Sequence, residues 1–252
     1  MFKSHIYEFK KLIQIGVPIL GSQLSYMLMG TTDTIVAGRA SSADLAGLGV
    51  GSAIFNTIWF LIAGVIFAVT PIVAQLYGAK KFNDIGTKLR EVLWIALALG
   101  FAVCIILFFM GNFLFYLPID TSITSISSSY LKALSLGIIF MTIFTTLRCY
   151  SEGMALTRPV FYIAFFGMLL NIPLDIIFVY GYFGVPKLGG VGCGIATTLV
   201  SFLMMLTLII YIFLSKNYSS TEPFSKFTPP SAKTTKEIFK LGTPIGFGIF
   251  IE

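Results

Sequence analysis

The sequence predicts an all-α polytopic membrane protein, in which a six-helix transmembrane bundle is followed by the start of a seventh helix. Apolar residues make up 56% of the chain and charged residues only 11%, with a mean hydropathy of +0.91. Such a composition cannot cover a globule that faces water. Apolar stretches also recur, each near or above the roughly 20 residues that a helix needs to cross about 30 Å of hydrocarbon. They span residues 12–37, 48–76, 92–117, 133–147, 160–183 and 190–214.

The first stretch follows a basic N-terminus, MFKSHIYEFKK, and a basic start before an apolar run also begins a signal peptide. This run is too long for a signal peptide, and no small-residue cleavage site closes it. We therefore expect an uncleaved first helix.

A polar segment at 215–237 separates the six stretches from a further apolar run that starts at about Ile238. The sequence YSSTEPFSKFTPPSAKTTKE within it contains three prolines and many Ser and Thr residues, which is typical of a flexible connector. On its two sides, KLIQIGVPILG at 11–21 and EIFKLGTPIGF at 237–247 share the pattern Gly-x-Pro-Ile. Six crossings return a chain to its starting side, so a second copy would run parallel to the first.

These features divide the sequence into three parts. We expect an N-terminal six-helix lobe at 1–214, a cytoplasmic inter-lobe linker at 215–237 and the truncated start of a second lobe at 238–252.

The charged residues predict the orientation in the membrane. All but three of the 17 Lys and Arg residues fall on the side of the N-terminus and the linker, the exceptions being Arg39, Lys132 and Lys187. By the positive-inside rule that side is cytoplasmic, which suits a multi-pass protein of the bacterial inner membrane. Basic loops beside anionic lipid account for the net charge of +6, so we expect no nucleic-acid partner.

Neither the cysteines nor the histidine predict an enzyme. Cys104, Cys149 and Cys193 show no metal or redox spacing, and we expect them to be structural. His5 is the only histidine and lies in the polar N-terminus, so no Ser/His/Asp triad or His-ligated metal site can be proposed. We therefore expect no enzymatic activity and no cofactor.

Two acids lie well inside apolar stretches. Asp33 is one, and the other is Asp175 in the segment LLNIPLDIIFVYG at 169–181, together with Asn171 and Pro173. A charged side chain in hydrocarbon is costly, so such acids normally face a bundle interior and serve transport or proton relay. A third acid, Glu252, ends the chain within the seventh apolar run.

The depths of the polar residues predict that they meet. At about 1.5 Å per residue, Asn171 and Asp175 lie roughly 18 and 24 Å along the fifth helix from its cytoplasmic start. On the same scale Asp33 lies roughly 30 Å along the first helix, and Thr197 roughly 12 Å into the sixth helix from the outer side. All four converge on the outer half of the bilayer.

The residue types favour a small cation. Asn171 and Asp175 are four residues apart and share one helical face, and Pro173 between them cannot donate to the carbonyl of Leu169, which predicts a kink. Carboxylate, amide, hydroxyl and carbonyl oxygens are hard donors that suit sodium, and a carboxylate can hold a proton. A polar clamp that joins the first and fifth helices would satisfy the same groups.

Several segments carry a family resemblance that extends from about residue 16 to 198. The chain resembles the N-terminal half of a multidrug and toxic compound extrusion (MATE) transporter of the NorM-like branch. The segments are GVPILGSQLSYMLMGTTDTIVAGR, DLAGLGVGSAIFN, TPIVAQLYGAKK, SEGMALTRP, LLNIPLDIIFVYG and GGVGCGIATT.

The resemblance implies a proton- or sodium-coupled antiporter that exports cationic amphipathic compounds and has twelve helices in two parallel lobes. Asp33, Asn171, Asp175 and Thr197 correspond to the cation site of the N-terminal lobe. Pro18 corresponds to a proline at which the first helix bends, and Glu252 to an acid that NorM-like members use in the second lobe.

The sequence has no counterpart of helices eight to twelve of the family. The resemblance therefore implies a fragment whose partner is a missing C-terminal lobe. Alternatives are a flippase for lipid-linked precursors, which would need a cavity lined with basic residues, and an inactive truncated relic.

The glycine-rich GLGVGS at 47–52 and GGVGCG at 189–194 lack the strand and lysine of a phosphate loop, and we expect them at close helix contacts.

Overall fold

The computed structural model describes residues 2–116, 118 and 120–251, and its regular structure in that part of the chain is helical. Six stretches are long and apolar enough to cross a membrane, and α2 and α3 together form the second of them. A further helix follows the sixth stretch, so the predicted fold class is confirmed. The elements are α1 (Phe2–Ala40), α2 (Ser42–Phe67), α3 (Val69–Gly78), α4 (Phe82–Phe113), η1 (Leu114–Tyr116), α5 (Thr121–Gly153), α6 (Thr157–Tyr180), α7 (Gly190–Leu214), η2 (Lys216–Thr221) and α8 (Ala232–Ile251).

The second stretch is broken, although the sequence pattern predicted one continuous run over 48–76. Its first helix ends at Phe67 and the next begins at Val69. Pro71 explains the position of the break, because it has no N–H to donate to the carbonyl of Phe67 four residues earlier.

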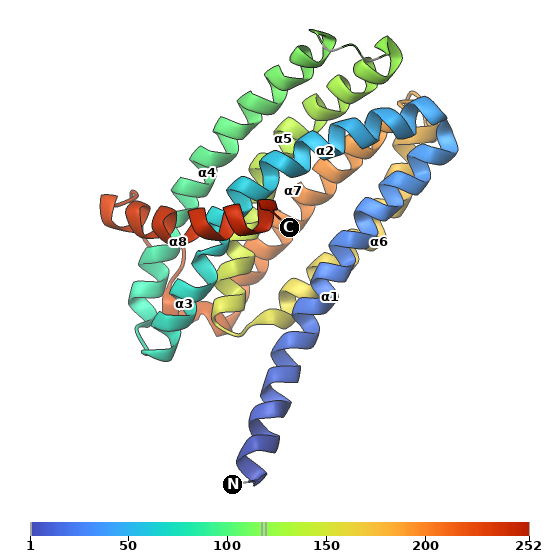
Figure 1. Cartoon of the computed structure of the whole chain (residues 1–252). Coiled ribbons are helices and arrows are strands. Elements are labelled where there is room, and N and C mark those ends of the chain that lie inside the picture. The colour runs from blue at the N-terminus through green and yellow to red at the C-terminus, as the bar shows by residue number, and fades with distance from the viewer. Residues whose placement is uncertain (1, 117, 119, 252) are drawn as a thin grey trace.

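The long helices run up and down along one direction (Figure 1). The α1–α2, α4–α5 and α6–α7 connections lie at one end, which we call the far end. The α3–α4 and α5–α6 connections lie with η2 at the other, which we call the linker end. Helix α5 is the most buried of the six stretches and packs on α2, α4 and α7, whereas α1 is the least buried and packs mainly on α6.

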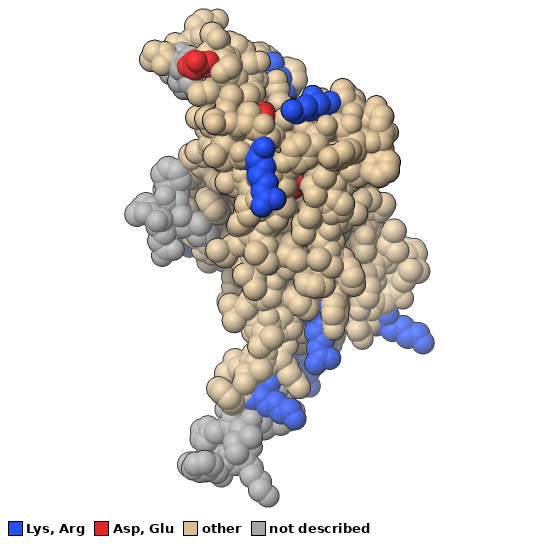
Figure 2. All heavy atoms as spheres, turned by 90° about the vertical axis from the view of Figure 1, so that its right-hand side faces the viewer, with Lys and Arg blue, Asp and Glu red and all other residues tan. Residues whose placement is uncertain are grey.

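The surface over α1 and α6 has the charge distribution of a membrane protein. Figure 2 shows basic side chains in the upper and lower parts of this face and a broad uncharged band between them. Large apolar side chains of α1 are exposed, among them Leu20, Leu24 and Met27. Exposure on this scale suits lipid rather than water.

A carboxylate at the far end joins the starts of two helices. Asp44 Oδ2 accepts from the hydroxyl of Ser41, the N-cap of α2, at 2.7 Å. Its Oδ1 accepts from the backbone N–H of Gly190 at the start of α7, at 2.6 Å. Gly189 precedes this contact with a φ of +57°, a left-handed conformation that favours glycine. The glycine-rich segment 189–194 therefore serves close contact between helices.

The polar segment after α7 is packed against the bundle, in contrast to the flexible connector that its composition predicted. Tyr218 and Thr221 of η2 are buried. The Tyr218 hydroxyl donates to Ser151 Oγ at 3.0 Å, and the hydroxyls of Thr221 and Tyr150 lie 2.5 Å apart. Burial raises the pKa of Tyr218 to about 12. These partners lie on α5, more than sixty residues away in sequence, and composition does not reveal them.

The last helix begins earlier than the expected residue 238 and lies across the bundle. Ser231 accepts a hydrogen bond from the backbone N–H of Thr234 at 3.2 Å, as an N-cap does, so α8 starts at Ala232. Figure 1 shows α8 running across α2 and α4 rather than beside them. At the crossing, a Cβ on Gly64 would collide with the backbone of Gly246. Glu252 lies outside the described residues.

The glycine contacts predict that a glycine-to-alanine substitution changes the free energy of unfolding very differently at two positions. A Cβ on Gly192 would lie 2.7 to 2.9 Å from backbone atoms of Phe178 and Val179, whereas a Cβ on Gly49 meets open space. We expect Gly192→Ala to lower the free energy of unfolding by about 1 to 3 kcal/mol. Gly49→Ala should be neutral or raise it by up to about 1 kcal/mol. Thermal unfolding of the purified chain in detergent measures both, and equal midpoints would contradict the packing of α7 on α6.

The packed linker predicts resistance to proteolysis. Trypsin should cleave wild type slowly at Lys226, because cleavage of a docked segment requires local opening. Tyr218→Ala removes a buried side chain and should raise that rate about tenfold or more. Tyr116→Ala, at an exposed tyrosine of the far end, is the matched control and should leave the rate unchanged. A linker that is cut as fast in wild type as in the Tyr218 variant would not be docked.

Candidate cation site

Helix α1 directs one carboxylate into the bundle. Asp33 is only 7% exposed, although much of α1 is open to the surroundings. The neighbouring hydroxyls of Thr31, Thr32 and Thr34 each donate to a carbonyl four residues earlier in the same helix, at 2.9 Å. In this part of α1 the Asp33 side chain therefore makes the polar contacts with other helices.

Helix α6 supplies the second carboxylate and an amide. Asn171 and Asp175 are both fully buried, one turn apart on the inward face. The Asn171 amide nitrogen donates to Asp175 Oδ1 at 3.4 Å. With the amide turned over, its nitrogen reaches both carboxylates, Asp175 Oδ2 at 3.2 Å and Asp33 Oδ1 at 3.3 Å. Asn171 can therefore bridge α1 and α6.

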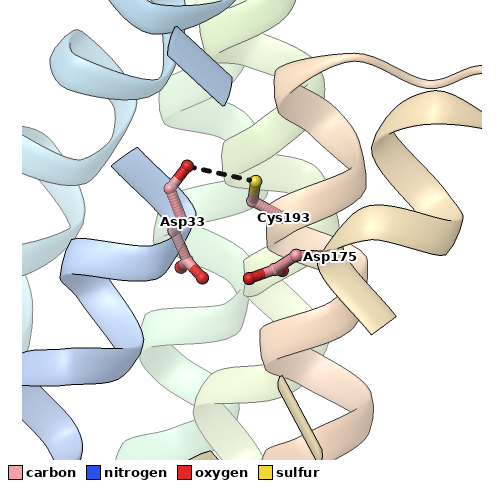
Figure 3. A group of neighbouring side chains, drawn as sticks. All are labelled: Asp33, Asp175 and Cys193. Atoms are coloured by element: carbon pink, nitrogen blue, oxygen red, sulfur yellow. Dashed lines mark hydrogen bonds between the residues drawn. The ribbon is translucent and has the colours of Figure 1, made fainter. Parts of the chain in front are cut away.

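Helix α7 holds Asp33 at two points. The Thr197 hydroxyl donates to Asp33 Oδ2 at 3.2 Å, and one turn earlier the Cys193 thiol donates to the Asp33 backbone carbonyl at 3.6 Å. Figure 3 shows the Asp33 and Asp175 carboxylates turned toward each other, with Cys193 beside them. One ligand atom from each of these three residues lies within 4.8 Å of the others.

The structure thus brings together the four residues that sequence reasoning selected, Asp33, Asn171, Asp175 and Thr197. Cys193 joins them, and sequence reasoning had given it only a structural role. Its position four residues before Thr197 is the signal that could have placed it on the same face of α7.

The two prolines lie apart from this cluster. Pro173 is on the exposed face of α6, opposite to Asn171 and Asp175, and α6 continues through it without a break. Pro18 lies in α1, 15 residues before Asp33 and thus roughly 22 Å along the helix. Neither proline has a polar side-chain group that could bind a cation.

The charge of the cluster is unbalanced. In the part of the chain that the structure describes, no Lys or Arg side chain makes a hydrogen bond or ion pair with Asp33 or Asp175. One amide and one hydroxyl donate to them instead. Two ionised carboxylates this close repel strongly in a medium of low dielectric constant. A proton or a small metal cation would relieve that repulsion, and oxygen-rich surroundings suit sodium.

A second polar cluster lies nearer the linker end. Arg148 is buried there, and its Nε donates to Glu152 Oε1 at 2.8 Å. Its guanidinium lies over the ring of Tyr26 on α1, 5.2 Å from the centroid, and 5.9 Å from that of Phe67 on α2. This cluster joins α1 to α5, and its charges balance.

Comparison with known proteins places this arrangement in a family. The family model described as MatE matches residues 18–177, which is more than half of the chain. The chain belongs to the MATE family. MATE proteins are membrane transporters, not enzymes, and the resemblance seen in the sequence is confirmed.

Two relatives show how much of a MATE protein this chain covers. The probable multidrug resistance protein NorM of Acinetobacter baylyi is 37% identical over 246 residues, which are 98% of this chain and 55% of the relative. The multidrug resistance protein NorM of Vibrio cholerae serotype O1 is 35% identical over 245 residues, which are 97% of this chain and 54% of the relative. The chain therefore spans about half the length of the curated relatives that it matches.

A solved structure supports the fold. The crystal structure of the eukaryotic MATE transporter AtDTX14 matches with a TM-score of 0.85 at 17% identity, over 98% of this chain and 54% of that chain. At this identity the likeness concerns the MATE fold alone.

The Thr197 contact predicts a measurable contribution to stability. Thr197→Val keeps the shape of the side chain and removes its hydrogen bond to Asp33, which should lower the free energy of unfolding by about 0.5 to 2 kcal/mol. Thr207→Val on the same helix is the control, because that exposed hydroxyl donates only to the carbonyl of Leu203 in its own helix. Thermal unfolding of the two purified variants measures this difference. Equal midpoints would show that the Thr197 hydrogen bond to Asp33 does not stabilise the fold.

Proposed function

We propose that this chain is the cation-binding lobe of a cation-coupled antiporter that exports cationic amphipathic compounds. The observation that carries the proposal is the buried pair Asp33 and Asp175, contributed by different helices and lacking a basic partner among the described residues. The coupling cation is a proton or a sodium ion. The relatives named as multidrug resistance proteins support the substrate class.

The cluster's position suggests how binding would be coupled to movement. Helix α1 has few attachments besides α6, and Asp33 is the point where both α6 and α7 reach it. A cation that neutralises the carboxylates would change how α1 packs. The helix would yield near Pro18, where proline leaves the carbonyl of Gln14 without its helical donor. With the N-terminus in the cytoplasm, this movement would release substrate to the outside.

The buried Arg148 does not favour a flippase for anionic lipid precursors. Such a carrier needs basic side chains inside the bundle that are free to bind an anionic headgroup, whereas the charge of the buried Arg148 is balanced by Glu152 at 2.8 Å. A lobe whose unbalanced buried charge is negative suits export of cations better.

Drug efflux tests the proposal in a protein that carries both lobes, made by joining this chain to the C-terminal half of the Acinetobacter baylyi relative. Asp33→Asn and Asp175→Asn should each reduce efflux of a cationic dye from efflux-deficient cells to the level of cells without the transporter. Asp120→Asn is the control. Asp120 is an exposed N-cap of α5 whose pKa is lowered by hydrogen bonds from Ser122, and asparagine caps as well.

The same protein in vesicles distinguishes the coupling ion. Transport driven by a sodium gradient at equal pH identifies sodium, and transport driven only by a pH gradient identifies the proton. If both Asn variants retain ion-dependent efflux, Asp33 and Asp175 form a structural clamp and the proposed coupling is wrong.

A further inference from the structure

A pocket at the linker end has no part in the cation site. It lies between α4 and the linker, with a volume of about 440 Å³. Its walls are mainly aromatic and aliphatic, and include Trp94 on α4 and Phe224 and Phe227 of the linker. The rings of Trp94 and Phe227 meet edge to face, with centroids 5.2 Å apart. The linker thus completes a cavity of the size that small ligands occupy.

The charged side chains that line this pocket are basic. Arg90 and Lys226 line it, and no Asp or Glu does among the residues that the structure describes there. The Arg90 guanidinium donates to Thr228 Oγ1 at 3.0 Å, to the Glu222 backbone carbonyl at 2.7 Å and to Thr87 Oγ1 at 3.0 Å. All three acceptors are neutral, so the hydrogen bonds fix the guanidinium in place and leave its charge uncompensated. A fixed guanidinium of this kind recognises phosphate.

The pocket lies at the edge of the hydrocarbon layer. The charged residues of α4 end at Glu91, and an apolar run of 22 residues, from Val92 to Phe113, follows. At about 1.5 Å per residue this run is roughly 33 Å long, close to the thickness of the hydrocarbon core. Arg90 is therefore at headgroup level, and Trp94 one turn deeper, where tryptophan is enriched in membrane proteins.

We propose that this pocket binds an anionic phospholipid. Arg90 and Lys226 hold the phosphate, and Trp94, Phe224 and Phe227 contact the glycerol backbone and the upper acyl chain. Because the walls come from both α4 and the linker, the bound lipid fastens the linker to the bundle. The site uses none of the residues of the proposed cation cluster, so it does not depend on the proposed function.

Native mass spectrometry of the full chain in detergent tests the proposal, with dioleoyl-phosphatidylglycerol and dioleoyl-phosphatidylcholine as probes. Wild type should retain phosphatidylglycerol in preference to phosphatidylcholine. Lys226→Gln should weaken phosphatidylglycerol binding about fivefold, since one basic group near a membrane surface contributes about 1 kcal/mol. Lys216→Gln is the control, because this exposed lysine lies nearby at the linker end and does not line the pocket.

Further variants and a displacement experiment identify the ligand of the pocket. Trp94→Ala should reduce lipid retention without changing the net charge, and inorganic phosphate at millimolar concentration should not displace the lipid. Arg90→Gln should abolish the preference for the anionic lipid, and because Arg90 also holds the linker, Lys226→Gln decides the outcome if that variant fails to fold.

Equal retention of the two lipids, or equal effects of the Lys226 and Lys216 substitutions, would overturn the proposal. Displacement by inorganic phosphate would show that the pocket binds the free anion and would equally overturn a lipid site.

Discussion

Helices α1, α6 and α7 meet around one pair of groups, the Asp33 and Asp175 carboxylates in the interior of the bundle. Helix α1 leaves most of its length exposed, and at Asp33 it is reached by both α6 and α7, through Asn171, Thr197 and Cys193. Placing two acids there is costly, and the surrounding amide and hydroxyl offset only part of that cost. The cluster therefore keeps two buried carboxylates close together without a basic partner among the described residues.

The Arg148 cluster gives α1 a second attachment of a different kind. There a guanidinium is balanced by Glu152 and covered by Tyr26 of α1, so its charges are satisfied with no further ligand. Both clusters lie in the second half of α1, with Tyr26 about two turns before Asp33. At one attachment the charges are balanced, and at the other two carboxylates meet without a basic partner among the described residues.

Much of this architecture could be read from the sequence, because hydrocarbon makes polar residues costly and so makes them informative. The six stretches follow from length and apolar composition, and Asp33, Asn171 and Asp175 stand out because few other acids and amides lie that deep. Thr197 is one of many threonines in the spans, and only its depth singled it out. The features that the sequence does not reveal are contacts between residues far apart in the chain. The docking of Tyr218 needs Ser151, and the burial of Arg148 needs the ring of Tyr26. The break before Val69 does not depend on a distant residue. Pro71 indicates it in the sequence, but the hydropathy pattern alone predicts a continuous helix.

The crossing of α8 over α2 brings two bare backbones together at Gly64 and Gly246. Because neither glycine has a side chain, the two helices approach there as closely as backbone atoms allow. Pairing of Lys88 with Glu237 fixes the start of α8 on α4. Helix α8 therefore links α4 and α2 directly, so that a tilt of either helix would be passed to the other through α8.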